Sequence, residues 1–259
     1  MEYIQSLFGL QGKVAAVIGG GGVLAGAMAD GLAKAGANVA ILDLNPENAQ
    51  ARAKAVQALG VKSVAVKADA SSRADMEQAL KQILSELGRI DILINAPGVN
   101  SATPFFDITE DEYEKIMRVN LKSMFLACQI FGKKMLEQGQ GGSIINISSA
   151  SSGPPLSKVF TYSLSKAAVN NLTQFLAREW ATQRIRVNAI APGFFPAEQN
   201  RKILTQERVD NIMRHTPMNR FGDAEELVGA TIWLASDKAS SFVTGAIVRV
   251  DGGYTAMTI

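Results

Sequence analysis

Short apolar segments alternate with longer amphipathic ones along the chain, and this alternation predicts an α/β fold. The short segments are rich in Val and Ile and have no helical period, as is typical of strands buried on both faces of a sheet. They are Lys13–Ile18, Asn38–Leu42, Ser63–Lys67, Ile90–Asn95, Ser143–Ile147, Arg186–Ile190 and Ala246–Val250. Strands that alternate with helices favour right-handed βαβ units. We therefore expect a doubly wound parallel sheet of seven strands with helices on both faces.

Polar residues mark the expected starts of three helices. Asn45 precedes Pro46, which places a capping residue before a proline at the first helical position. Residues 109–112 read Thr-Glu-Asp-Glu, the pattern of a capping box. Residues 223–226 read Asp-Ala-Glu-Glu, which puts acidic side chains in a first helical turn.

Composition and charge narrow the class of protein. The chain has 259 residues, of which 47% are hydrophobic and 19% charged, so it can bury one large core. No linker or repeat interrupts it, and we expect a single domain over residues 1–259 with a substrate-covering segment at about 194–222. The 26 basic and 24 acidic residues leave no electrostatic footprint for nucleic acid or a membrane surface. Without a signal peptide or a spanning segment, a cytoplasmic protein is expected.

The chain contains one cysteine and one histidine. Cys128 cannot form an internal disulfide, and a reducing compartment is the simplest fit. Together with His215 it cannot supply a usual zinc site, so no metal is expected. A Ser-His-Asp or Cys-His mechanism would have to use His215, which lies in a basic, loop-like setting before Pro217. If the protein is an enzyme, we expect a different acid–base group.

A glycine-rich turn follows the first expected strand. The turn, Gly19–Gly26, leads into a helix, and such a turn lets a pyrophosphate approach N–H groups at the helix N-terminus. The second strand leads to Asp43, and an acid at that position accepts hydrogen bonds from adenosine ribose hydroxyls. The turn contains no Lys or Arg, and Leu44 follows the acid, so a 2′-phosphate would meet a carboxylate without a nearby cation. We predict NAD(H) in preference to NADP(H).

A second candidate site lies after the fifth strand. Tyr162 and Lys166 are four residues apart on an expected helix, so they share one face. A neighbouring ammonium favours the phenolate and is expected to lower the tyrosine pKa, which gives an acid–base group without histidine. Ser149, at the end of the strand, is placed to hold a substrate oxygen. Asn120, inside a long helix, is expected to hold a water that relays protons.

These motifs, in this order and spacing, resemble the short-chain dehydrogenase/reductase family over essentially the whole chain. The motifs are Gly19–Gly26, Asp43, Asp69-Ala70, Asn95-Ala96-Pro97-Gly98, Asn120, Ser149, Tyr162, Lys166, Pro192-Gly193 and Val250-Asp251-Gly252-Gly253. The resemblance implies a Rossmann-like sheet and a catalytic tetrad of Asn120, Ser149, Tyr162 and Lys166. It also implies a homotetramer, or a homodimer, with the C-terminal strand near a subunit interface.

The resemblance also implies a set of coenzyme contacts. These are Gly19, Gly22, Leu24, Asp43, Leu44, Asp69, Ala70, Asn95, Gly98, Tyr162, Lys166, Pro192, Gly193 and Phe195. They come from the glycine turn, the ends of the second, third and fourth strands, the catalytic helix and the segment after the sixth strand.

A closer likeness concerns the substrate. Residues 142–149, 192–204 and 216–222 resemble the D-mannonate oxidoreductase (fructuronate reductase) branch, with gluconate 5-dehydrogenases as near relatives. A sugar acid needs a cation for its carboxylate and amides for its hydroxyls. We therefore expect Lys158 or Arg201 to pair with the carboxylate, the alternative being that both are solvated surface charges. Substrate contacts are also expected from Asn100 and Asn200.

The expected function is that of an NAD(H)-dependent oxidoreductase which interconverts a secondary alcohol and a ketone on a sugar acid. One alternative is a 3-ketoacyl thioester reductase, which the apolar pairs Phe105-Phe106 and Phe194-Phe195 would favour. Another is a non-catalytic NAD-binding regulator, which would not need an activated tyrosine. A methyltransferase could share the glycine turn and its acid but would leave Tyr162 and Lys166 unexplained.

Overall fold

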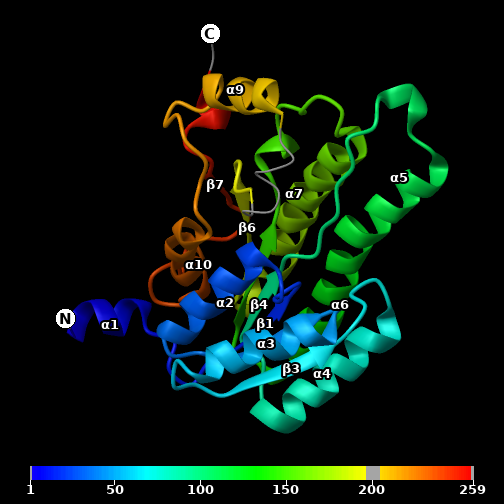
Figure 1. Ribbon diagram of the computed structural model, residues 1–259. Coiled ribbons are helices and arrows are strands. Elements are labelled where there is room, and N and C mark those ends of the chain that lie inside the picture. The colour runs from blue at the N-terminus through cyan, green and yellow to red at the C-terminus, as the bar shows by residue number, and fades with distance from the viewer. Residues whose placement is uncertain (1, 197–204, 258–259) are drawn as a thin grey trace.

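The computed structural model describes residues 2–196 and 205–257 and confirms the α/β class. Its seven strands form one parallel sheet in the order β3-β2-β1-β4-β5-β6-β7 (Figure 1). The strands are β1 Val14–Ile18, β2 Asn38–Asp43, β3 Ser63–Lys67, β4 Ile92–Asn95, β5 Gly142–Ile147, β6 Ile185–Pro192 and β7 Ile247–Val250. The order reverses between β1 and β4, and in doubly wound sheets a ligand binds beyond the strand ends at this point.

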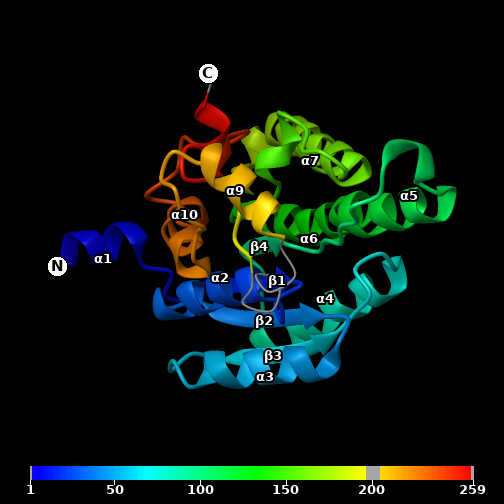
Figure 2. The same cartoon turned by 45° about the horizontal axis from the view of Figure 1, so that its top comes forward.

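Helices cover both faces of the sheet, as the sequence predicts (Figure 2). The described helices are α1 Glu2–Phe8, α2 Val23–Lys34, α3 Pro46–Gln57, α4 Arg73–Leu87, α5 Glu110–Met117, α6 Ser123–Gln138, α7 Phe160–Trp180, α9 Gln206–Arg214 and α10 Val228–Ala235. One face packs against α2, α3 and α10, and the other packs against α4, α6 and α7. Successive strand residues serve opposite faces, so Val17 belongs to the first core and Ile18 to the second.

Helices start at all three positions that the sequence predicts, with one difference in the capping contacts. Asn45 caps α3 by accepting hydrogen bonds from two backbone N–H groups. The capping box at residues 223–226 is complete, but it opens a short 3₁₀ helix ahead of α10. Of the capping box expected at residues 109–112, only the contact made by the Thr109 side chain forms. Thr109 caps the backbone of Glu112, whereas the Glu112 carboxylate accepts hydrogen bonds from hydroxyl groups in the preceding loop.

Cys128 lies in the core under the sheet. It is only 1% exposed, and its Sγ is 3.4 Å from the Nδ2 atom of Asn95. Burial raises the pKa of this thiol to about 12. The side chain therefore acts as a small apolar residue, as its sequence neighbours suggest.

The predicted cover is described only in part, at residues 194–196 and 205–222. This part includes α9, which lies beyond the carboxyl ends of the strands (Figure 1). No helix in the described residues is long and apolar enough to span a membrane. The cytoplasmic location stays a prediction.

Candidate active site

A cleft of 650 Å³ lies at the carboxyl edge of the sheet. The glycine turn, the segments after β4, β5 and β6, and helices α7 and α9 all contribute to its lining. Eleven of the residues expected from the sequence meet there: Gly19, Gly22, Leu24, Gly98, Asn100, Ser149, Tyr162, Lys166, Pro192, Gly193 and Phe195. Segments far apart in the chain thus converge on one space beyond the topological reversal of the sheet.

Three polar groups form the reactive end of the cleft. The Tyr162 hydroxyl is hydrogen bonded to Ser149, which follows β5. One turn along α7, the Nζ atom of Lys166 lies 5.7 Å from the centroid of the Tyr162 ring. The same Nζ donates a hydrogen bond to the carbonyl oxygen of Ile147 at 2.8 Å. The end of β5 therefore holds both the serine and the lysine against the tyrosine.

The lowered tyrosine pKa that the sequence suggests is wrong for the protein alone. Burial raises the pKa of Tyr162, and the hydrogen bond from Ser149 offsets only part of that rise. Lys166 is itself buried, which lowers the pKa of its ammonium group to about 8. Removing both groups from water disfavours their charged forms, and this desolvation outweighs their mutual attraction. In the protein alone, Tyr162 is therefore harder to ionise than a free tyrosine.

Asn120 lies in a π-helical turn, Arg118–Lys122, between α5 and α6. Its side chain is fully buried; its Oδ1 atom accepts a hydrogen bond from the backbone N–H of Val99 at 2.8 Å. Its Nδ2 atom donates to the Val99 carbonyl and to the Oγ atom of Ser165, each at 3.0 Å. Since both amide hydrogens are used within the protein, a water held by this amide would have to compete with these contacts. The side chain ties the loop after β4 to α7.

The backbone around the cleft leaves room for a dinucleotide. Gly19 has a φ of +74° and passes the Ala96 carbonyl oxygen so closely that a Cβ would lie 3.0 Å from it. Gly22 caps α2, and because glycine has no side chain to bond the first N–H groups of the helix, these groups are left for a pyrophosphate. At the other end, a Cβ on Gly98 would lie 3.7 Å from the Nζ atom of Lys166. These residues fit the coenzyme that the sequence predicts.

Asp43 lies against the glycine turn rather than in the lining of the cleft. Its Oδ2 atom accepts a hydrogen bond from the backbone N–H of Gly21 at 3.0 Å, and its Oδ1 atom accepts one from Asn45 at 2.9 Å. Leu44 is 67% exposed beside it. The nearby Arg52 of α3 forms an ion pair with Asp30 at 2.6 Å. The Asp43 carboxylate therefore lies at the edge of the glycine turn, and Arg52 is already paired with another carboxylate.

The remaining expected contacts lie apart from the cleft. Asp69 and Ala70 lie between β3 and α4, where the Asp69 carboxylate accepts hydrogen bonds from Ser71. Asn95 is fully buried, and its amide donates to Asn146 and Cys128 within the core.

Two of the expected substrate residues lie outside the described residues, and a third does not line the cleft. Asn200 and Arg201 belong to the part of the chain that is not described. Lys158 is exposed, has a φ of 65°, and does not line the cleft.

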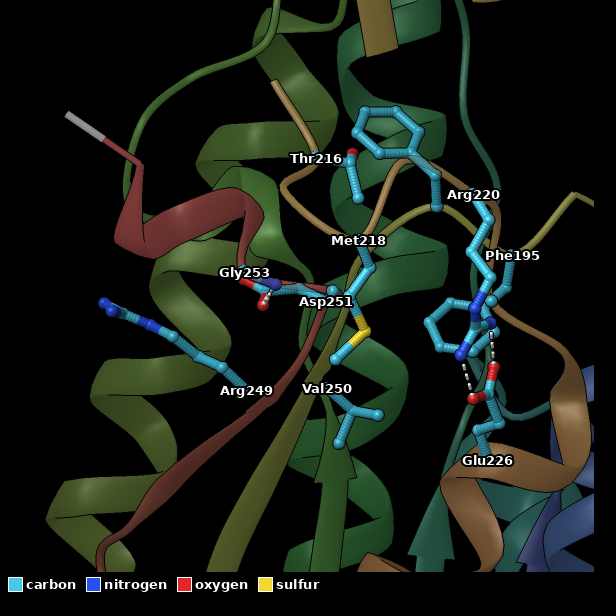
Figure 3. Close-up of a pocket in the computed structure, with 12 residues that line it drawn as sticks. Phe195, Thr216, Met218, Arg220, Glu226, Arg249, Val250, Asp251 and Gly253 are labelled. Carbon is cyan, nitrogen blue, oxygen red and sulfur yellow. Dashed lines mark hydrogen bonds and ion pairs between the residues drawn. The ribbon is translucent and has the colours of Figure 1, made fainter. Parts of the chain in front are cut away.

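A second cavity, of 370 Å³, is lined in part by the segment after β6 (Figure 3). Within it Arg220 forms a two-pronged ion pair with Glu226, with N–O distances of 2.8 and 2.6 Å. A Cβ on Gly222 would overlap the ring of Phe195, and one on Gly193 would lie 2.7 Å from the Cα atom of Asp251. The sequence predicts Gly193 and Phe195 as coenzyme contacts, but it gives no sign of the ion pair between Arg220 and Glu226, which depends on how separate segments pack.

Comparisons with known proteins cover nearly the whole chain. A sequence profile described as enoyl-(acyl carrier protein) reductase matches residues 22–255. The uncharacterized oxidoreductase UxuB of Bacillus subtilis (strain 168) is 41% identical over 268 residues, or 95% of this chain and 96% of that protein.

Two solved structures superpose closely. A Haemophilus influenza protein with bound NAD, provisionally assigned as a D-mannonate oxidoreductase, is 37% identical, with a TM-score of 0.93 over 98% of this chain and 99% of that one. A gluconate 5-dehydrogenase from Burkholderia cenocepacia J2315, in complex with NADP and tartrate, is 34% identical, with a TM-score of 0.93 over 98% of this chain and 100% of that one.

Proposed function

Because the chain belongs to the short-chain dehydrogenase/reductase family of oxidoreductases, which act on secondary alcohols and ketones, we propose that it is an NAD(H)-dependent dehydrogenase of sugar acids. The observation that carries this proposal is the meeting of Tyr162, Lys166 and Ser149 in the cleft that begins at the glycine turn. The coenzyme, when bound, accepts or supplies the hydride at the substrate carbon.

The residues of this chain handle the proton and the substrate oxygen. In alcohol oxidation Tyr162 takes the proton from the substrate hydroxyl, and in ketone reduction it returns a proton to the oxygen. Ser149 holds that oxygen by a hydrogen bond and also contacts the tyrosine. Lys166 supplies a positive charge that favours the phenolate, fixed in position by the Ile147 carbonyl.

The preference for NAD over NADP rests on the edge of the glycine turn. Asp43 presents a carboxylate there, and the exposed Leu44 beside it offers no charge to a 2′-phosphate. Family membership does not decide between the coenzymes, because the Haemophilus structure holds NAD and the Burkholderia structure holds NADP.

The sugar-acid substrate is supported by two relatives, one provisionally assigned to D-mannonate and one named for gluconate. We expect the purified protein to reduce NAD⁺ with D-mannonate or D-gluconate and to oxidise NADH with a ketohexonate, both followed at the NADH absorbance band. The panel should include 3-hydroxyacyl and 3-ketoacyl thioesters. Turnover of the thioesters without turnover of any hexonate would replace the proposal by its alternative, to which Phe194 and Phe195 would contribute an apolar surface.

We also propose that the protein is a homotetramer built in part on α5, α6 and α7. An apolar groove of 500 Å³ follows these helices and includes Tyr113, Leu121, Phe125 and Leu172. Phe125 is 44% exposed, and both acidic and basic residues border the groove, so the same patch on two copies can pair opposite charges.

Phe125→Glu is expected to reduce the mass measured by light scattering, because it places a charge in this apolar contact. Tyr3→Glu, on α1 at the opposite side of the molecule, is the control (Figure 1). A wild-type protein that is monomeric at micromolar concentration would contradict the proposal.

A further inference from the structure

Arg208 of α9 lies where two cavities meet. It lines the catalytic cleft together with Tyr162, Ser149 and Asn100. It also lines an adjoining pocket of 240 Å³, in which polar groups are prominent. The polar residues of that pocket are Ser157, Arg208, Asn211, His215 and Tyr254. Because Leu156, Phe194 and Ile212 line both spaces as well, the pocket is a side chamber of the cleft on the α9 side.

The charges around this junction favour an anion. None of the described residues that line the cleft or the side chamber is acidic. Lys166, the other cation of the cleft, is buried and donates to the Ile147 carbonyl. Arg208 is only partly buried, and its Nη1 atom donates to the Ser157 hydroxyl at 2.9 Å. None of the ion pairs formed within the described residues involves Arg208.

The charge of Arg208 also acts on Tyr254, which lines the same chamber. Burial raises the pKa of Tyr254, and the positive charge of Arg208 acts against that rise. The ring of Tyr254 packs against Phe194, with centroids 5.2 Å apart, and both rings line the chamber. The chamber therefore combines a cation, hydroxyl and amide groups, and an apolar wall.

We propose that Arg208 binds the carboxylate of the substrate and is the residue that selects hexonates over uncharged sugar alcohols. The proposal rests on the proposed function. The reacting hydroxyl lies at Tyr162, the carboxylate lies at Arg208, and the hydroxyls of Ser157 and Tyr254 are available to the acid end. A guanidinium has a planar pair of donors that matches the two oxygens of a carboxylate. Arg208 takes the role that the sequence offers to Lys158, which is exposed and lines neither space.

Arg208→Gln tests this assignment with two substrates that differ only in the charged group, D-mannonate and D-mannitol. We expect the KM for D-mannonate to rise about 10- to 100-fold, because a charge-assisted hydrogen bond is lost, while kcat changes little. The kcat/KM for D-mannitol should stay within about twofold, because that substrate has no carboxylate to bind. Arg208→Lys should recover part of the lost affinity, since it keeps the charge without the two-pronged geometry.

Arg214→Gln is the matched control, because Arg214 is exposed on the same helix and lines neither cavity. It should leave both substrates unaffected, and NADH binding should be unchanged in every variant. If Arg208→Gln weakens both substrates equally, or neither, the inference is wrong and the proposed function stands. If the unaltered enzyme acts on thioesters and on no hexonate, the proposed function is itself wrong, and this result is distinct from the first.

Discussion

Tyr162→Phe is expected to lower kcat in both directions by about 10²- to 10⁴-fold, the usual contribution of a positioned acid–base group. NADH affinity should remain, because the phenyl ring keeps the shape of the cleft and only the hydroxyl is lost. In the unaltered enzyme the kcat/KM for alcohol oxidation should rise with pH. Burial raises the pKa of Tyr162, so the phenolate that acts as base becomes more populated as the pH increases.

Stopped-flow turnover and NADH fluorescence titration separate the chemistry from coenzyme binding in this variant. Tyr3→Phe provides the control, because Tyr3 is 73% exposed on α1 and lies far from the cleft. The residual activity of Tyr162→Phe should lose the dependence on pH that Tyr162 imposes. Unchanged turnover would refute the assignment of the base, and retained NADH binding without any wild-type turnover would favour a regulator.

The double variant Asp43→Ala/Leu44→Arg should shift the ratio of kcat/KM for NAD over that for NADP by about 10²- to 10³-fold toward NADP. A 2′-phosphate beside a carboxylate costs several kcal/mol, and the substitutions remove that repulsion and add a cation. The ratio is the useful quantity, since loss of the hydrogen bond from Gly21 to Asp43 also disturbs the turn that both coenzymes share.

Glu47→Gln controls for the loss of a negative charge near the turn, because Glu47 lies in the first turn of α3 and is exposed. It should leave the coenzyme ratio within about twofold of the wild type. A wild-type enzyme that prefers NADP would show that Asp43 does not repel the 2′-phosphate, and the proposed coenzyme would then be wrong.

The sheet could be predicted from the sequence because most positions in its strands are apolar. Each expected strand matches an observed one to within two residues at either end, and the largest differences are at the start of β4 and the end of β6. The glycine turn and the pairing of Tyr162 with Lys166 on one helix face were also accessible, since a strand leads into the turn and the two side chains are four residues apart. Such features depend on local pattern and on strand ends that share one edge.

The parts that the sequence could not predict depend on how separate segments pack. The Glu112 carboxylate accepts hydrogen bonds from two hydroxyl groups of the preceding loop, although its spacing from Thr109 suits a capping box. The pKa of Tyr162 depends on how deeply both it and Lys166 are buried, and their spacing on one helix does not reveal that depth. Arg208 gave no motif signal, because its relation to the cleft depends on where α9 lies across the strand ends.

The buried thiol of Cys128 provides an intrinsic reporter of how often the core opens. With the sulfur 1% exposed and its pKa raised to about 12, a thiol-specific reagent can react only after the surrounding helices and strands separate. Since it is the only cysteine in the chain, the labelling rate under native conditions measures that opening without an added probe. For each variant described above, the labelling rate of Cys128 can therefore report conformational stability in the same preparation that is used for kinetics.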